Sequence, residues 1–171
     1  MSITTKKGDD GYTDIIGGKR LPKDHLIPEC LGAIDELDAF LGDAKAALPD
    51  NAADFTVNVI SGIQKDLIKL MGIIAGMPVP KEGTGEGRIN SLIKELESLL
   101  PPFSSFAVPG ANPVSAKLHI ARTVCRRAER RLVSLSSSQN GSEIAGAVGP
   151  YINRLSDLLF LLAQYHQINK Q

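Results

Sequence analysis

The sequence has no tryptophan, few aromatic residues and no excess of charge of either sign. Its 171 residues carry 19 Lys and Arg against 19 Asp and Glu, so the formal net charge is zero. Proteins that bind nucleic acid or acidic membranes mainly through charge usually have a basic excess, and we expect neither partner here. Cys30 and Cys125 stand in neither a CxxC nor a Cys/His metal spacing, which predicts two reduced thiols.

Long hydrophobic runs are also missing. The longest, at 158–163, is far too short to span a bilayer, and no apolar segment follows the charged N-terminus as it would in a secretory signal. We therefore expect a cytoplasmic protein without a membrane segment. A chain of this length fits one domain, 1–171, which buries roughly two thirds of its unfolded surface and needs no disulfide or structural metal.

Apolar residues recur at spacings of three and four in five segments, which is typical of amphipathic helices. These apolar stripes occupy 31–48, 57–74, 89–99, 118–135 and 152–165. We expect the first helix to begin near Pro28 and the fourth at Pro113, which Asn112 can cap. The pair Gly149-Pro150 should kink or restart the last helix, because proline cannot donate the helical hydrogen bond. The sequence therefore predicts an all-α fold, an antiparallel five-helix bundle.

The first two dozen residues form a different segment, rich in glycine and charge, which predicts an irregular loop or hairpin. Its glycines let backbone N–H groups point at an anion, and the side chains of Thr5, Lys6 and Thr13 add donors. Neither a Walker A loop nor a GxGxxG fingerprint is present. A tight turn with surface lysines explains the pattern equally well.

Five of the eight arginines fall within ten residues of the fourth expected helix, at Arg122, Arg126, Arg127, Arg130 and Arg131. Arg122, Arg126 and Arg130 recur at i, i+4 and i+8 and share one stripe beside the apolar face. Glu129 follows Arg126 by three residues and is placed to orient it. A solvated basic face is the common alternative, but such a face tolerates lysine, and this helix has none after position 117. The rigid fork of arginine suits bidentate binding of phosphate or carboxylate.

Acidic and amide side chains form a second set of candidates. Asp35, Glu36 and Asp38 crowd the first helix, and Asn153 shares a helix face with Asp157. Solvated carboxylates and interhelical hydrogen bonds are the alternative explanations of these two groups. The chain has no Glu-x-x-His di-iron pattern and no GxSxG nucleophile elbow, so neither of these chemistries is indicated.

The segment 103–110 is an apolar loop directly before the arginine-rich helix. Loops normally lie on the surface and avoid such residues. Phe106 either plugs the end of the bundle or forms the wall of a pocket for a large flat ligand.

Six motifs stand in order along the chain. They cover Thr5–Thr13 (TKxGDxGxT), Arg20–Lys23 (RxxK), Gly32–Leu37 (GxxDEL), Phe106–Gly110 (FxVPG), Ala121–Arg130 (ARxxCRRAER) and Asn153–Asp157 (NRLSD). Together they resemble the PduO-type ATP:cob(I)alamin (corrinoid) adenosyltransferases, and the resemblance runs from residue 4 to about 166. It implies a transferase that moves the 5′-deoxyadenosyl group of ATP to the Co(I) of cob(I)alamin, giving adenosylcobalamin and triphosphate.

The resemblance also implies partners and a division of the chain. The family forms homotrimers with active sites between subunits, and we expect a reductase and an adenosylcobalamin-dependent enzyme as partners. Residues 1–24 would form the ATP-binding loop and 25–171 the helical bundle. The ATP-contacting positions of the family match Thr5, Lys6, Lys7, Gly8, Tyr12, Thr13, Lys23, Arg126, Arg127, Glu129, Arg130 and Asn153. Mg²⁺ is expected to be held mainly by the ATP phosphates.

Four positions match residues with a catalytic role in the family. Arg122 and Arg126 match the essential arginines, and Asp35 matches a carboxylate that pairs with an arginine across the subunit interface. Phe106 matches the aromatic residue that blocks the lower face of the corrin ring. Because Co(I) itself attacks the ribose C5′, no protein base is required. A nucleotide sensor without alkyl transfer, and a structural oligomer with interfacial arginine ion pairs, are the alternatives.

Three features depart from the family pattern. Asp38 stands where asparagine is common, and Gly149-Pro150 lies in a helix that is usually continuous. The chain also ends at Gln171, without the longer tail of some relatives. We expect this last difference to affect the affinity for the corrinoid more than the affinity for ATP.

Overall fold

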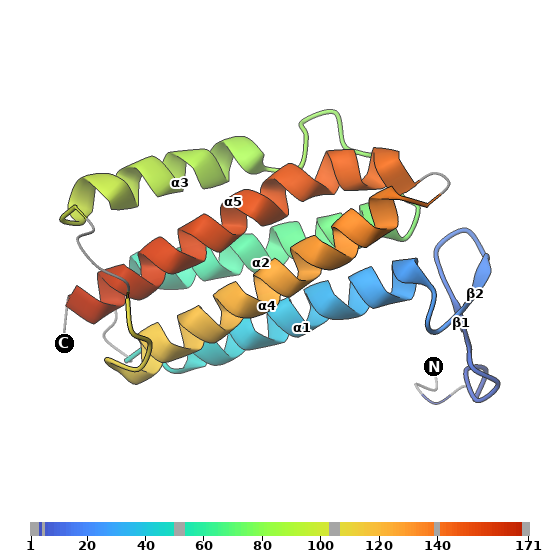
Figure 1. The fold of residues 1–171 in the computed structure, drawn as a ribbon, viewed down its shortest axis with the longest axis horizontal. Helices are drawn as coiled ribbons and strands as arrows, with labels where there is room; N and C mark the ends of the chain where they lie inside the picture. Colours follow the sequence, from blue (N-terminus) through green and yellow to red (C-terminus); the bar gives the residue numbers. More distant parts are fainter. Residues whose placement is uncertain (1–3, 5, 50–53, 103–106, 139–140, 169–171) are drawn as a thin grey trace.

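The computed structural model describes residues 4, 6–49, 54–102, 107–138 and 141–168, and it confirms the all-α fold (Figure 1). The elements are β1 (Tyr12–Asp14), β2 (Arg20–Pro22), α1 (Leu26–Ala46), α2 (Asp54–Ile74), α3 (Glu86–Leu99), α4 (Pro113–Ser136) and α5 (Gly141–Ile168). Helix α4 packs on both α1 and α5, while α2 packs on α1 and α3 packs on α5. The two strands lie beyond one end of the bundle, beside the start of α1. Within the described residues, none of the helices has an apolar stretch long enough to cross a membrane.

Helix α1 begins at Leu26, slightly earlier than the expected start near Pro28. The cause is a side-chain cap, because the Nδ1 of His25 accepts a hydrogen bond from the Ile27 backbone N–H at 3.2 Å. Pro28 consequently lies inside the first turn, where backbone N–H groups have no intrahelical acceptor and a proline costs nothing.

Helix α4 begins at Pro113, as predicted. The Oδ1 of Asn112 caps it by accepting a hydrogen bond from the Ser115 backbone N–H at 2.8 Å. The amide of the same side chain donates to the carbonyl of His166 at 2.7 Å. One asparagine thereby caps α4 and joins its first turn to the last turn of α5.

Helix α5 contradicts the expected restart at Gly149-Pro150, since it runs unbroken over 28 residues. Pro150 leaves the carbonyl of Gly146 without its helical donor. Both residues are exposed, so water can satisfy that carbonyl, and Gly146 places no side chain where the proline ring needs space. The helix therefore tolerates a proline on its solvent side.

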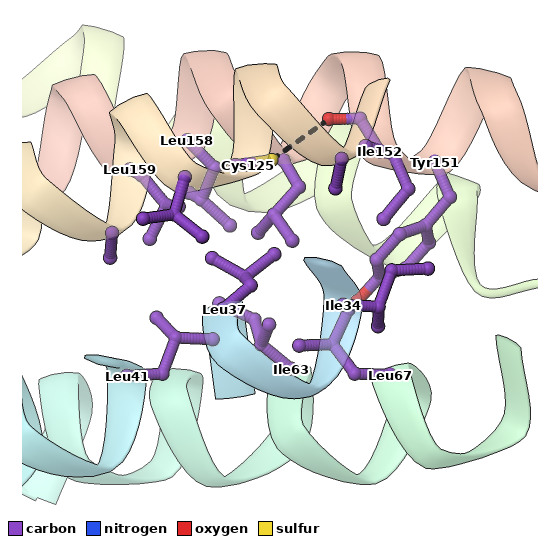
Figure 2. Close-up of a cluster of buried hydrophobic side chains, with 14 of the residues drawn as sticks. Ile34, Leu37, Leu41, Ile63, Leu67, Cys125, Tyr151, Ile152, Leu158 and Leu159 are labelled. Atoms are coloured by element: carbon purple, nitrogen blue, oxygen red, sulfur yellow. Dashed lines mark hydrogen bonds between the residues drawn. The ribbon is translucent and has the colours of Figure 1, made fainter. Parts of the chain in front are cut away.

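The core forms where the apolar stripes of the helices meet (Figure 2). Its fully buried side chains include Ile34, Leu37 and Leu41 of α1, Ile63 and Leu67 of α2, and Ile152, Leu158 and Leu159 of α5. Cys125 belongs to this core, as predicted, and its Sγ donates to the carbonyl of Ile152 at 3.3 Å. Both cysteines are free, and burial raises the pKa of Cys30 to about 11 and also raises the pKa of Cys125. Neither thiol is therefore a reactive thiolate near neutral pH.

A buried carboxylate joins α2, α3 and α5. Asp66 of α2 is only 8% exposed, and its Oδ2 accepts hydrogen bonds from Arg88 Nη2 at 2.5 Å and from the Tyr151 hydroxyl at 3.0 Å. Burial and the nearby Asp66 charge raise the pKa of Tyr151, which stays a neutral donor. A Cβ on Gly85, whose φ is 91°, would lie 3.0 Å from the same oxygen, so glycine suits this close approach.

We expect Tyr151→Phe to lower the free energy of unfolding by about 1–3 kcal/mol, because it removes a donor from a buried carboxylate. Urea denaturation measures the change. Tyr165→Phe is the matched control, since Tyr165 is half-buried and its hydroxyl has no hydrogen-bond partner among the described residues. The control should lose no more than about 0.5 kcal/mol. Equal losses in the two variants would contradict a stabilising role of the Tyr151 hydroxyl.

Candidate functional site

The N-terminal segment forms a short antiparallel hairpin, within the predicted alternatives of loop or hairpin. Strands β1 and β2 pair in the register Tyr12 to Pro22, Thr13 to Leu21 and Asp14 to Arg20. Gly17 and Gly18 carry the chain between the strands with φ of 85° and 75°. These left-handed conformations favour glycine, so two of the glycines are explained by the turn itself.

Arg20 holds the loop before β1 in a fixed shape. Its Nη2 donates to the carbonyl of Lys7 at 2.6 Å and to the carboxylate of Asp10 at 2.6 and 2.7 Å. This guanidinium lowers the pKa of Asp10. The backbone N–H of Lys23 also donates to the carbonyl of Gly11 at 2.9 Å. The sequence placed Arg20 in a motif but did not assign it to the site.

The hairpin and the loop enclose a cavity of about 360 Å³. Its lining consists of Lys7, Gly8, Tyr12, Thr13, Asp14 and Lys23. Five of these six were predicted as ATP contacts, and Asp14 was not. A Cβ on Gly8 would lie 3.1 Å from the Nζ of Lys23, so glycine leaves this ammonium room beside the backbone. Lys6 is exposed at the edge of the loop, and Thr5 lies outside the described residues.

The five arginines of α4 separate onto two edges of the helix. Arg127 forms an ion pair with Glu36 of α1, and Arg131 forms one with Glu29 at 3.3 Å. The predicted stripe emerges on the other side, with Arg122 half-buried and Arg126 and Arg130 exposed. Across the part of the chain that the structure describes, these three guanidinium groups have no carboxylate partner. Arg127 is thus set apart from the stripe with which it was predicted to bind ATP.

A groove of about 660 Å³ opens beside this stripe. It is lined by Asn90, Ile93, Lys94 and Glu97 of α3, Arg122 and Arg126 of α4, and Arg154, Ser156, Asp157, Phe160 and Leu161 of α5. Arg122 and Arg126, two of the predicted site residues, therefore line the same groove as apolar side chains. The α3 residues were missed by sequence reasoning, because no sequence motif places α3 against this face.

Glu129 contacts Asn153 rather than Arg126, which differs from the expected orienting role. The Nδ2 of Asn153 donates to the Oε1 of Glu129 at 2.6 Å. The pair lines a second hollow of about 560 Å³ between α4 and the first half of α5, and Arg154 lines both hollows. The two predicted ATP contacts thus form one unit beside the arginine groove.

The remaining predicted residues lie elsewhere. Asp35 is exposed on α1 and has no ion-pair partner among the described residues, whereas one oxygen of Asp38 is buried without a hydrogen bond. Phe106 lies outside the described residues. The hairpin that lines the N-terminal cavity lies past the end of the bundle beside the start of α1 (Figure 1). Arg122, in contrast, is near the middle of α4, which runs from Pro113 to Ser136. One chain therefore does not gather the lysine-lined cavity and the arginine groove into a single pocket.

No group of three or more His, Cys, Asp or Glu side chains within the described residues is arranged to hold a metal ion. Two carboxylates beside the arginine groove are already engaged, because Glu129 accepts a hydrogen bond from Asn153 and Asp157 pairs with Arg154 at 3.5 Å.

Comparison with known proteins identifies relatives along nearly the whole chain. The family model described as cobalamin adenosyltransferase matches residues 3–166. A corrinoid adenosyltransferase from Bacillus subtilis is 38% identical over 170 residues, which cover 96% of this chain and 86% of that protein. The human corrinoid adenosyltransferase MMAB is 34% identical over 176 residues, covering 95% of this chain and 68% of that one.

Solved structures share the fold. An arginine-to-lysine variant of the PduO-type adenosyltransferase from Lactobacillus reuteri, complexed with ATP, has a TM-score of 0.86 at 30% identity and covers 97% of this chain and 94% of its own. A phenylalanine-to-alanine variant from the same organism, complexed with cobalamin and ATP, has a TM-score of 0.86 at 28% identity, covering 98% and 94%. All of these relatives are adenosyltransferases, a class of transferase. The chain belongs to the cobalamin adenosyltransferase family, which confirms the resemblance seen in its motifs.

One buried and one half-buried histidine predict that the stability of the fold falls in mild acid. Burial lowers the pKa of His119, with a further contribution from the charge of Arg122, and burial lowers the pKa of His166. In the unfolded chain both groups titrate near about 6.5. The folded state therefore binds fewer protons, and stability is lost as the pH falls from about 6.5 through the folded values.

We expect the Tm of the wild type to fall over this range by more than the Tm of a His119→Gln, His166→Gln double variant. Calorimetry at a series of pH values between about 7.5 and 5 measures the difference. Parallel curves for the two proteins would show that these histidines do not cause the acid sensitivity.

Proposed function

We propose how this adenosyltransferase carries out its reaction, in which the 5′-deoxyadenosyl group of ATP moves to the Co(I) of cob(I)alamin. The observation that carries the proposal is the stripe Arg122, Arg126 and Arg130. None of these guanidinium groups forms an ion pair within the described residues, and Arg122 and Arg126 line the groove of about 660 Å³. We assign the triphosphate of ATP to this stripe. Unpaired guanidinium groups on a rigid helix suit a polyphosphate.

The chemistry needs positioning and charge rather than a protein base. An electron pair of Co(I) forms the Co–C bond at the ribose C5′, and the C5′–O bond breaks with its pair passing to the departing triphosphate. The growing negative charge on that oxygen requires preorganised cations, which Arg122 and Arg126 supply. Holding the cobalt in line with C5′ and the leaving oxygen is the other requirement.

The N-terminal cavity is assigned to ATP as well. Lys7 and Lys23 bring two positive charges, Gly8 leaves its backbone accessible, and Thr13 adds a hydroxyl. Mg²⁺ would be carried mainly by the phosphates of ATP, since this cation is usually held by substrate phosphates with only one or two carboxylates. Bound there, it would supply further positive charge to the leaving group.

A complete site would then form between two subunits of a homotrimer. The separation of the lysine-lined cavity from the arginine groove within one chain supports this arrangement, and so does the exposed Asp35, which would pair with an arginine of the neighbouring subunit. A reductase that delivers Co(I) and an enzyme that uses adenosylcobalamin complete the set of partners. The two free thiols support a reducing, cytoplasmic location.

We expect Arg126→Ala to abolish adenosylcobalamin formation while leaving the trimer intact, because it removes a cation from the leaving group. The measurement mixes protein, ATP and chemically reduced cobalamin, and follows loss of the Co(I) absorbance together with triphosphate release. Arg131→Ala on the same helix is the matched control, because its exposed ion pair with Glu29 contributes little. Near-normal turnover by Arg126→Ala would remove this residue from the site. ATP binding by the wild type without any triphosphate release would instead favour a nucleotide sensor.

We expect Phe106→Ala to retain ATP binding but to lose four-coordinate, base-off cob(II)alamin, because the aromatic wall that excludes the lower ligand is gone. Absorbance and electron paramagnetic resonance spectra of cob(II)alamin, recorded with ATP and protein, report the coordination. Phe40→Ala serves as the control for loss of an aromatic ring, since Phe40 of α1 is partly buried against the hydrophobic core of the bundle. Spectra that are the same for wild type and Phe106→Ala would rule out this role.

A further inference from the structure

Three buried polar groups on α4 have no hydrogen-bond partner in the described structure. They are the Oγ of Ser115, both ring nitrogens of His119 and the Nε of Arg122. Ser115 is fully buried and His119 is 3% exposed. A buried polar group without a partner lowers the stability of the fold, so three of them on one helix require an explanation.

Their spacing places these groups next to one another. The positions 115, 119 and 122 are separated by four and then three residues, so their side chains follow one another on one face of the helix. Neighbouring Cβ atoms at these spacings lie about 5–6 Å apart. The three groups can therefore reach one another by rotation of their side chains alone.

The groups are also complementary as donors and acceptors. The Nε of Arg122 can only donate a hydrogen bond. A neutral imidazole accepts at one ring nitrogen and donates from the other, and a serine hydroxyl does both. If Arg122 donates to His119 and His119 donates to Ser115, each of the three groups has a hydrogen-bond partner.

The surroundings of His119 favour the neutral ring that this order requires. Its imidazole meets Phe160 of α5 edge-on, with the ring centroids 6.1 Å apart. Burial, together with the charge of Arg122, lowers the pKa of His119. A protonated imidazole has no free lone pair and cannot accept from a guanidinium.

We propose that His119 is a positioning residue for Arg122, with one ring nitrogen accepting the Arg122 Nε–H and the other donating to the Ser115 Oγ. The serine hydroxyl then donates to a backbone carbonyl of the preceding turn, as serines in helices commonly do. This chain of hydrogen bonds runs beneath the surface of α4. It accounts for every one of the three unpartnered groups with side chains already present.

This role of His119 rests on the proposed function, in which Arg122 faces the leaving triphosphate. Arg122 lines the groove of about 660 Å³ beside Phe160. With its Nε held from below, the two terminal nitrogens of the guanidinium keep one direction toward the groove. The rotamer freedom of the arginine is then lost on folding rather than on binding ATP. His119 therefore influences the reaction without touching ATP or cobalamin.

The variants His119→Leu and His119→Gln, made in the full-length protein, distinguish positioning from simple filling of space. Leucine removes both polar positions, whereas glutamine retains one acceptor and one donor. We expect His119→Leu to lower kcat about tenfold, with a smaller change in the KM for ATP, and His119→Gln to recover most of the loss. Turnover by the wild type in the same assay tests the proposed function by itself. Failure of the proposed function is therefore distinguishable from failure of the positioning role. Full activity of His119→Leu would overturn the proposal.

A double-mutant cycle tests whether His119 acts through Arg122. Arg122→Lys keeps the charge but has no Nε–H, so His119→Leu should lower kcat far less in this background than in the wild type. His166→Leu is the matched control, because it also removes a histidine with a polar contact, and its half-buried ring has Nε2 3.0 Å from Thr56 Oγ1. The control should have an effect additive with Arg122→Lys. If the effects of His119→Leu and Arg122→Lys on kcat are also additive, the proposal is overturned.

Nitrogen NMR of the His119 ring gives a readout that does not depend on activity or on the leucine variant folding. The wild type should show one neutral tautomer at neutral pH. Arg122→Lys should shift the resonance of the accepting nitrogen, because that nitrogen loses its donor. Ring resonances that are identical in the two proteins would overturn the proposal.

Discussion

Helix α4 packs on α1 along one side and on α5 along another, and this double packing decides where its charged side chains can lie. Its inward faces are occupied by buried small and apolar residues, namely Leu118, Ala121, Val124, Cys125, Ala128, Leu132 and Leu135. A guanidinium buried between the helices would lose its hydration, and an ion pair seldom offsets the free energy that this desolvation costs. The arginines therefore leave the helix along its two edges, and each edge faces a different environment.

The two edges of α4 differ in their net charge because different side chains lie opposite them. On the α1 edge, Glu29 and Glu36 neutralise Arg131 and Arg127 within the same chain. Such exposed pairs add little stability, but they leave this edge without excess charge. On the other edge the arginines have no carboxylate partner in the described residues, so their positive electrostatic potential can attract an anionic ligand. A chain with a net charge of zero thus concentrates positive potential in one place.

Features set by local periodicity could be predicted from the sequence, and features set by contacts between helices could not. The stripe at Arg122, Arg126 and Arg130 follows from the helical repeat, and the start of α4 follows from Asn112-Pro113. The bond between Glu129 and Asn153 depends on the register of α4 against α5, which no spacing within either helix reveals. The family resemblance supplied candidate site residues and an active site between subunits, but it did not reveal which of these residues line the same hollow within one chain.

Two features of the helices differ from the detail expected from the sequence. The cap formed by His25 moves the start of α1 earlier, because a histidine rarely takes this position and the rules of capping favour smaller side chains. Pro150 is accommodated within α5 because its face of the helix is exposed, and exposure is known only once the helices are packed. In the first case a local side chain provides the cap, and in the second the local rule is correct but the packing of the helices changes its outcome.

Arg20 gives the N-terminal loop its shape before any nucleotide arrives. A free glycine-rich segment loses roughly 1–2 kcal/mol of conformational entropy for each backbone residue that becomes fixed. Because the bonds to the carbonyl of Lys7 and the carboxylate of Asp10 form within the folded chain, much of this ordering precedes the arrival of a ligand. If ATP binds in this cavity as proposed, the strength of its binding would be determined partly by a side chain that is absent from the lining of the cavity.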